Sequence, residues 1–215
     1  HDALCRFLAE EAQVRVIAVD YRLAPEAPFP AGFDDAWAAW KWVAQHAKGI
    51  AVDPTRIAVG GDSAGGCFAA LVAQHAVRDE GIKPAFQLLI YPVTDFLNAS
   101  ERPKAYADGF YLTTAYMDLG EESYLLGDED KADPRLSPLH QDVAGVAPAH
   151  VVTAGFDLLL DEGKAYADKL RAAGVPVEYV CEESLIHSFA NMVAAGTSAP
   201  RAMRRVAAAL QRGLS

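Results

Sequence analysis

Short apolar runs alternate along the chain with longer stretches in which apolar side chains recur every three or four residues. This alternation is typical of βαβ units that build a mostly parallel sheet. The apolar runs predict strands over residues 14–19, 56–60, 85–91, 151–154 and 177–180. The helical spacing predicts helices over residues 33–47, 64–78, 161–173 and 199–213. The pattern therefore favours a single α/β domain over residues 1–215.

One long segment, residues 96–147, interrupts this alternation between the third and fourth predicted strands. It scatters aromatic side chains among acidic ones and shows no strand pattern. One interpretation is a surface insertion of two helices. The other is that the insertion contributes to a cap and lines a substrate cleft, because long insertions in compact domains often serve as lids or binding loops.

A candidate nucleophile lies between the second predicted strand and the helix that follows it. Residues 61–65 read Gly-Asp-Ser-Ala-Gly and match the pattern G-x-S-x-G. The match alone is weak, but a strand ends just before it and an Ala-rich helix begins just after it. Such a turn strains the backbone at Ser63 and places its hydroxyl at a helix N-terminus, where N–H groups stabilise an oxyanion. The alternative is a Gly-rich phosphate-binding loop or an ordinary tight turn, but the chain has no Walker lysine and no G-x-G-x-x-G sequence.

A serine nucleophile needs a base to take its proton and an acid to orient that base. In a fold with this strand–serine–helix turn, the acid and then the histidine follow the serine along the chain. Asp157 comes directly after the strand predicted at 151–154 and fits the acid. Asp161 and Glu162 are nearby alternatives, but their positions suit the first turn of the next helix, where the helix dipole favours carboxylates.

Of the six histidines, His187 alone follows a late strand and precedes the last helix. The other five occupy places that do not suit the base: His46 and His75 within helices, His1 at the terminus, His140 in the insertion and His150 at the start of a strand. The sequence therefore predicts a triad of Ser63, Asp157 and His187.

These residues resemble those of the hormone-sensitive lipase-like carboxylesterases of the α/β-hydrolase fold, in the subgroup that carries Gly-Asp-Ser-Ala-Gly-Gly, here residues 61–66. The stretch from Asp20 to Ala31 is similar to the segment after that family's fourth strand. Residues 157–163 resemble its D-P-L-x-D-E-G motif with leucine in place of proline, and residues 187–189 resemble its H-G-F with serine in place of glycine. The resemblance implies an α/β-hydrolase fold with a mostly parallel sheet.

One departure from the family concerns the oxyanion hole. The family carries an H-G-G-G loop after its third strand, whereas this sequence has no such motif and residues 1–6 resemble the helix that follows the loop. The resemblance therefore implies an N-terminally incomplete chain that lacks the N-terminal strands and cap helices, with the Ala64 N–H as the oxyanion donor still present. We expect the structure to show either an upstream segment from another chain or a gap beside the 56–60 strand, and we expect the 215-residue chain by itself to aggregate or to be nearly inactive.

Charge and composition exclude several other classes of protein. The chain has 19 basic and 29 acidic residues, and its net charge of −10 repels phosphate backbones and anionic membranes. Its hydrophobic fraction of 52% argues against disorder, and no apolar run is long enough to span a bilayer. The three scattered cysteines, Cys5, Cys67 and Cys181, are too few for a disulfide framework or a metal site and fit a reducing compartment. We therefore expect a cytoplasmic protein with no nucleic-acid partner.

The predicted function is hydrolysis of carboxylic esters through an acyl-enzyme, with no metal or other cofactor. The preference for short to medium acyl groups comes from the resemblance alone. An amidase or deacetylase on the same triad is one alternative, and a catalytically crippled fragment or non-catalytic binding protein of the same fold is another. The resemblance also implies a homodimer through the 177–180 edge strand and the C-terminal helix.

Overall fold

The predicted alternation is present in the structure, a computed structural model that describes residues 1–99, 102–127, 131 and 133–215. Its strands are β1 (Ala58–Asp62), β2 (Phe86–Ile90), β3 (Ala149–Phe156) and β4 (Val177–Ile186). Its α-helices are α1 (Asp2–Ala12), α2 (Ala31–His46), α3 (Ala64–Arg78), α4 (Thr114–Tyr124), α5 (Leu160–Ala172) and α6 (Ser198–Gly213). Short 3₁₀ helices are η2 (Lys104–Tyr106), η3 (Pro138–His140) and η4 (Phe189–Met192). The four predicted helices are confirmed, whereas β3 and β4 extend beyond the predicted strands.

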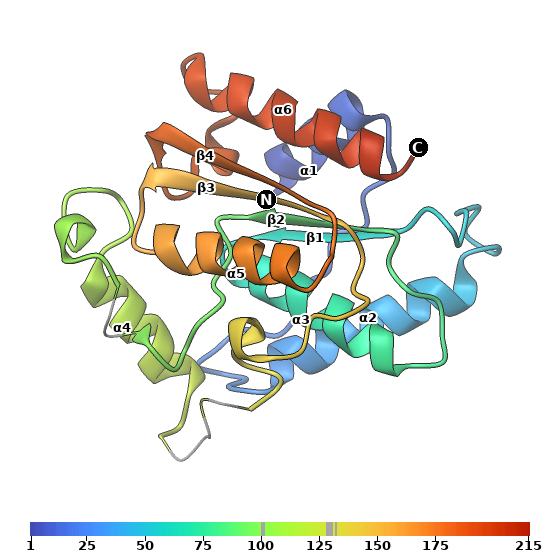
Figure 1. The fold of residues 1–215 in the computed structure, drawn as a ribbon, viewed down its shortest axis with the longest axis horizontal. Helices are drawn as coiled ribbons and strands as arrows, with labels where there is room; N and C mark the ends of the chain where they lie inside the picture. The colour runs from blue at the N-terminus through green and yellow to red at the C-terminus, as the bar shows by residue number, and fades with distance from the viewer. Residues whose placement is uncertain (100–101, 128–130, 132) are drawn as a thin grey trace.

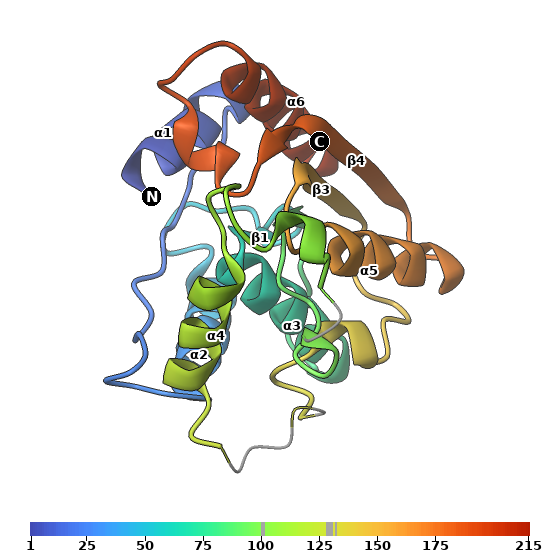
Figure 2. The same ribbon diagram turned by 90° about the vertical axis from the view of Figure 1, so that its left-hand side faces the viewer.

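Within the described residues, the strands form one parallel sheet in the order β1-β2-β3-β4. Helices α1 and α6 cover one face of the sheet, and α2, α3 and α5 cover the other (Figures 1 and 2). Successive side chains of β2 point to opposite faces: Leu88 and Ile90 pack in the core on the α1 and α6 side, and Leu89 packs in the core on the α3 and α5 side. Burial of both faces explains why β2 is apolar at every position except Gln87.

The strand predicted at residues 14–19 is not formed, so this prediction was wrong. Residues 14–23 carry no strand, and Ile17 and Val19 are 45% and 41% exposed. A strand requires a neighbour that pairs with its backbone N–H and C=O groups. Among the described residues, none supplies a ladder to this segment. The β-branched residues give it strand propensity, but propensity alone does not replace a pairing partner.

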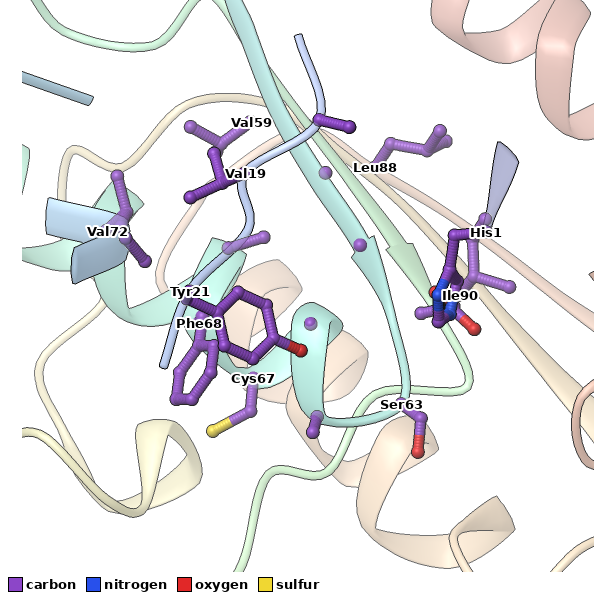
Figure 3. Close-up of a pocket in the computed structure, with 18 of the residues that line it drawn as sticks. His1, Val19, Tyr21, Val59, Ser63, Cys67, Phe68, Val72, Leu88 and Ile90 are labelled. Atoms are coloured by element: carbon purple, nitrogen blue, oxygen red, sulfur yellow. Dashed lines mark ion pairs between the residues drawn. The ribbon is translucent and has the colours of Figure 1, made fainter. Parts of the chain in front are cut away.

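A large cavity separates this segment from the sheet. It has a volume of about 1190 Å³, lies between residues 13–24 and β1, and continues to Ser63. Figure 3 shows the segment that carries Val19 and Tyr21 running alongside β1, with Ser63 at the turn that ends the strand. Because β1 is the edge strand of the sheet, its unpaired edge lies along this opening. The structure therefore contains the gap that was expected beside the nucleophile strand.

The insertion at 96–147 contains one α-helix, α4, and two 3₁₀ helices in its described part, rather than two α-helices. Residues 100–101, 128–130 and 132 lie outside the described residues. From the described part, Leu112, Tyr116, Met117 and Tyr124 line the same cavity as Ser63. The position of the insertion thus fits the second interpretation, while its part in substrate binding stays a prediction.

Two kinds of feature, membrane-spanning helices and metal sites, are absent from the described part of the chain. No helix there has the length and apolar character needed to cross a bilayer. No group of three or more His, Cys, Asp or Glu side chains there is arranged to hold a metal ion. Cys5, Cys67 and Cys181 are free thiols. The cytoplasmic location stays a prediction.

Candidate active site

Ser63 forms the one-residue turn between β1 and α3. Its backbone has φ 56° and ψ −119°, a combination that L-residues rarely adopt, which confirms the predicted strain. The Ser63 N–H donates to the Ile90 carbonyl at 2.9 Å, and the Ser63 carbonyl accepts from the N–H groups of Cys67 at 3.1 Å and Val93 at 3.2 Å. These bonds fix the turn against the end of β2 and hold the strained conformation.

The glycines around Ser63 allow the backbone to pack closely. A Cβ at Gly61 would lie 2.3 Å from the Gly65 carbonyl, and a Cβ at Gly66 would lie 2.8 Å from Cβ of Pro92. Ala64, the predicted oxyanion donor, is exposed and is the first residue of α3. Because the first N–H groups of a helix have no partner within it, Ala64 presents a donor directly beside the serine.

The structure brings the three predicted catalytic residues together. Asp157 directly follows β3 and His187 directly follows β4, and their side chains are buried. His187 Nδ1 lies 2.8 Å from Asp157 Oδ2, and His187 Nε2 lies 3.0 Å from Ser63 Oγ. Since a carboxylate only accepts, Nδ1–H donates to Asp157, and Nε2 is left to accept the serine hydroxyl proton. Asp157 Oδ1 also accepts the Leu159 N–H at 3.0 Å, which fixes the carboxylate.

The remaining histidines have other partners. His140 Nε2 lies 2.8 Å from Asp95, His150 Nδ1 lies 3.3 Å from Glu178, and His1 Nε2 lies 3.2 Å from Asp62. The Nδ1 atoms of His46 and His75 contact backbone carbonyls within their own helices. None of these five contacts the Ser63 hydroxyl through a hydrogen bond that the structure describes.

Glu162 has a buried position that the sequence did not reveal. It lies in the first turn of α5 as predicted, but its side chain is only 9% exposed and pairs with Arg102 at 3.0 Å. Its Oε1 also accepts the Thr94 N–H at 2.7 Å. Burial raises the pKa of Glu162 to about 7, although Arg102 and the Thr94 N–H act in the opposite direction. No local sequence pattern indicates the pairing of Glu162 with Arg102, because Arg102 lies 60 positions earlier in the chain.

Sequence reasoning also missed Tyr91, which contacts the base, and Asp62, which contacts Tyr91. The Tyr91 ring packs against the His187 imidazole, and the Tyr91 hydroxyl contacts Asp62. Asp62 directly precedes the serine, and Tyr91 directly follows β2, so both lie at the edge of the sheet where strand ends meet. Position beside the nucleophile was the one signal that could have singled out Asp62.

Comparison with known proteins agrees with this geometry. A family model for the alpha/beta hydrolase fold matches residues 1–191. The carboxylic ester hydrolase LipN of Mycobacterium tuberculosis is 44% identical over 223 residues, which cover 100% of this chain and 59% of LipN. The ethyl acetate hydrolase of Pseudomonas putida is 40% identical, with 100% of this chain and 68% of that protein covered. The chain thus spans about three-fifths of the length of LipN.

Solved structures show the same similarity. The ester hydrolase EH1AB1 from the metagenome of Lake Arreo, in complex with a derivative of bipyridine phosphonate, has a TM-score of 0.95 and 45% identity, covering 99% of this chain and 68% of that one. A thermostable esterase from Pseudomonas putida ECU1011 has a TM-score of 0.94 and 38% identity, covering 100% of this chain and 69% of that one. The similarity therefore includes nearly all of the described fold.

Proposed function

The chain belongs to the α/β-hydrolase fold family, and on that premise we propose that the protein is a serine carboxylic ester hydrolase of the hormone-sensitive lipase-like branch. Its substrates are short to medium acyl esters. The observation that carries the proposal is the pair of contacts, 2.8 Å and 3.0 Å, that joins Asp157 through His187 to Ser63. Relatives named carboxylic ester hydrolase and ethyl acetate hydrolase support an ester as the substrate.

The first half of the reaction forms an acyl-enzyme. Ser63 Oγ bonds to the acyl carbon while its proton passes to His187 Nε2. The imidazolium then gives this proton to the alcohol oxygen, and the ester C–O bond breaks as the alcohol leaves. Asp157 keeps the proton on Nδ1 and stabilises the imidazolium that forms between the two steps.

The second half releases the acid. A water molecule bonds to the acyl carbon while His187 takes one of its protons. Collapse of this intermediate breaks the bond to Ser63, whose oxygen recovers a proton from the imidazolium. In both halves negative charge develops on the former carbonyl oxygen, and the Ala64 N–H at the start of α3 stabilises it.

The insertion supplies part of the substrate cleft. Tyr111, Leu112, Tyr116 and Met117 lie on or just before α4 and line the cavity that reaches Ser63. Tyr111 and Tyr116 are 65% and 67% exposed, so their rings offer apolar surface to the cavity that reaches Ser63. An acyl or alcohol group of an ester is held there by apolar contact.

An organophosphonate tests the covalent step directly. We expect one phosphonyl group per chain, located on Ser63 by mass spectrometry, with loss of p-nitrophenyl acetate hydrolysis. Ser63→Ala should lose both labelling and hydrolysis, whereas Ser184→Ala, an exposed serine on β4, should keep both. A label on another residue, or full turnover by Ser63→Ala, would contradict the proposal.

Paired substrates separate an esterase from an amidase or deacetylase on the same triad. p-Nitrophenyl acetate and p-nitroacetanilide differ only in the atom that links the acetyl group to the nitrophenyl ring, which is oxygen in the ester and nitrogen in the amide. We expect hydrolysis of the ester and little or none of the amide. Comparable rates on the two, or a preference for the amide, would assign the protein to the alternative class.

The free edge of β4 is a candidate dimer contact. β4 is the last strand of the sheet, and α6 is linked to it by the ion pairs Arg205–Glu182 and Arg212–Glu178. An unpaired strand edge invites pairing with a second chain, so we propose a homodimer through β4 and α6. Light scattering at micromolar concentration should show the dimer as the smallest species; a monomer alone would reject the dimer.

A further inference from the structure

The carboxylate of Asp62 joins separate parts of the chain beside the nucleophile. Its side chain is only 11% exposed. Its Oδ2 accepts hydrogen bonds from the Tyr91 hydroxyl at 3.3 Å and from the Asn191 side-chain amide at 3.1 Å. Its Oδ1 lies 3.2 Å from His1 Nε2. Asn191 belongs to η4, directly after the loop that carries the base. Asp62 therefore connects the end of β1, the end of β2 and the histidine loop.

The ring of Tyr91 packs against the imidazole of His187, the catalytic base. The residue is fully buried, and its ring centroid lies 4.5 Å from that of the His187 imidazole at an interplanar angle of 50°. Its other ring neighbour, Phe189, packs edge-on at 5.1 Å. The Tyr91 N–H donates to the Val152 carbonyl at 2.6 Å, which anchors the backbone. Burial raises the pKa of Tyr91, so its hydroxyl stays protonated and continues to donate to Asp62.

We propose that Asp62 and Tyr91 are positioning residues for His187, with Asp62 fixing the tyrosine ring and the ring fixing the imidazole. The inference rests on the proposed esterase function. His187 must present Nδ1 to Asp157 and Nε2 to Ser63 at the same time, so rotation of the imidazole breaks one of these contacts. A rigid ring against one face of the imidazole restricts that rotation. A misplacement of about 1 Å at a reacting group costs about 10²-fold in rate.

Variants of Tyr91 separate the contribution of the ring from that of the hydroxyl. Tyr91→Leu removes the ring, and we expect kcat for p-nitrophenyl acetate to fall by about 10²-fold. Tyr91→Phe keeps the ring and removes one hydrogen bond, so a fall of about 3- to 10-fold is expected. KM should change little in either variant, because neither group contacts the ester. Tyr166→Phe is the matched control: Tyr166 is equally buried, bonds to Gln74 at 3.1 Å and should keep wild-type kinetics.

A double-variant cycle tests whether Asp62 acts through Tyr91. If the two share one hydrogen bond, Tyr91→Phe should have no further effect in an Asp62→Ala background. Asp62→Asn keeps an acceptor oxygen and should recover most of the activity lost in Asp62→Ala. If Asp62→Ala does not fold, the cycle is run with Asp62→Leu, which keeps the shape of the side chain but removes both oxygens, against Tyr91→Phe. Independent, fully additive losses would overturn the part of the inference that concerns Asp62.

A proton NMR signal gives a readout that does not depend on turnover. The His187 Nδ1 proton bonded to Asp157 should give a downfield resonance in the wild type and in Tyr166→Phe. In Tyr91→Leu, the same resonance should broaden or vanish although the protein remains folded. A wild type that the phosphonate does not label would refute the proposed function itself. A labelled wild type with Tyr91→Leu equal to Tyr166→Phe in kcat and in this resonance would refute the positioning inference alone.

Discussion

Asp157 orients His187 by accepting hydrogen bonds on both of its oxygens. Oδ2 accepts from His187 at 2.8 Å, and Oδ1 accepts from the Leu159 N–H at 3.0 Å. Asp157→Asn keeps the shape of the side chain but offers an N–H where His187 needs an acceptor, so the imidazole adopts the wrong tautomer. We expect kcat to fall by about 10⁴-fold, the loss that this change causes in serine triads. Asp161→Asn in the first turn of α5 is the control and should stay within about 3-fold of wild type. Activity of Asp157→Asn near that of Asp161→Asn would contradict the assigned role.

Because the pKa of Glu162 is raised, we expect the stability of the protein to depend on pH. Its pKa is raised by burial from 4.5 to about 7 in the folded chain. Between these values the folded state holds more protons than the unfolded state, so the free energy of unfolding falls as pH rises from 4.5 to about 7. Titration of Glu162 lowers the free energy of unfolding by an amount on the order of 3 kcal/mol.

Urea unfolding at pH 5 and pH 7.5 should show this decrease in the wild type, and the decrease should be missing in Glu162→Gln. The exposed Glu183→Gln should retain the wild-type slope, and equal slopes in all three proteins would show that Glu162 titrates normally.

Among the elements, the turn from β1 to α3 depends on glycine for its close packing. Gly61→Ala would place a Cβ 2.3 Å from the Gly65 carbonyl, so the backbone must shift. We expect a loss of about 1–3 kcal/mol in the free energy of unfolding, as for other overpacked sites. Gly65→Ala is a control within the same motif, because a Cβ there meets nothing within 4 Å. It should keep or raise stability by about 0.5–1 kcal/mol, since alanine favours a helix. Equal destabilisation of both variants in urea unfolding would show that the close approach at Gly61 is not decisive.

For the whole molecule, we expect the opening beside β1 to affect how the chain associates in solution. An unpaired strand edge next to exposed apolar side chains promotes pairing between chains. We expect the 215-residue chain by itself to associate beyond a dimer in light scattering and to hydrolyse esters weakly. Ile17→Lys places a charge at the opening and should reduce this association. Trp42→Lys removes an exposed apolar side chain that does not line the cavity and should not. A chain that remains dispersed, unfolds cooperatively and hydrolyses short esters at ordinary esterase rates would contradict this expectation.

The sequence by itself determined the features that depend on local chemistry or on order along the chain. Helical spacing placed α2, α3, α5 and α6 because apolar periodicity is a property of neighbouring residues. The turn at Ser63 followed from the glycines two positions before and after it, between a strand and a helix. Asp157 and His187 were selected because each follows a strand, and parallel strands end at the same edge of the sheet.

Tertiary structure alone decided the features that depend on distant partners. The β-branched run at 14–19 carries strand propensity, yet no strand forms because backbone pairing requires a neighbour. Glu162 looked like an ordinary first-turn acid until the fold buried it against Arg102. The contact from Asp62 to Tyr91 likewise joins positions 29 residues apart. The periodicity of apolar residues indicates which side chains prefer burial. Whether a charged side chain is buried, or a strand pairs with a neighbour, depends on residues that lie far away in the sequence.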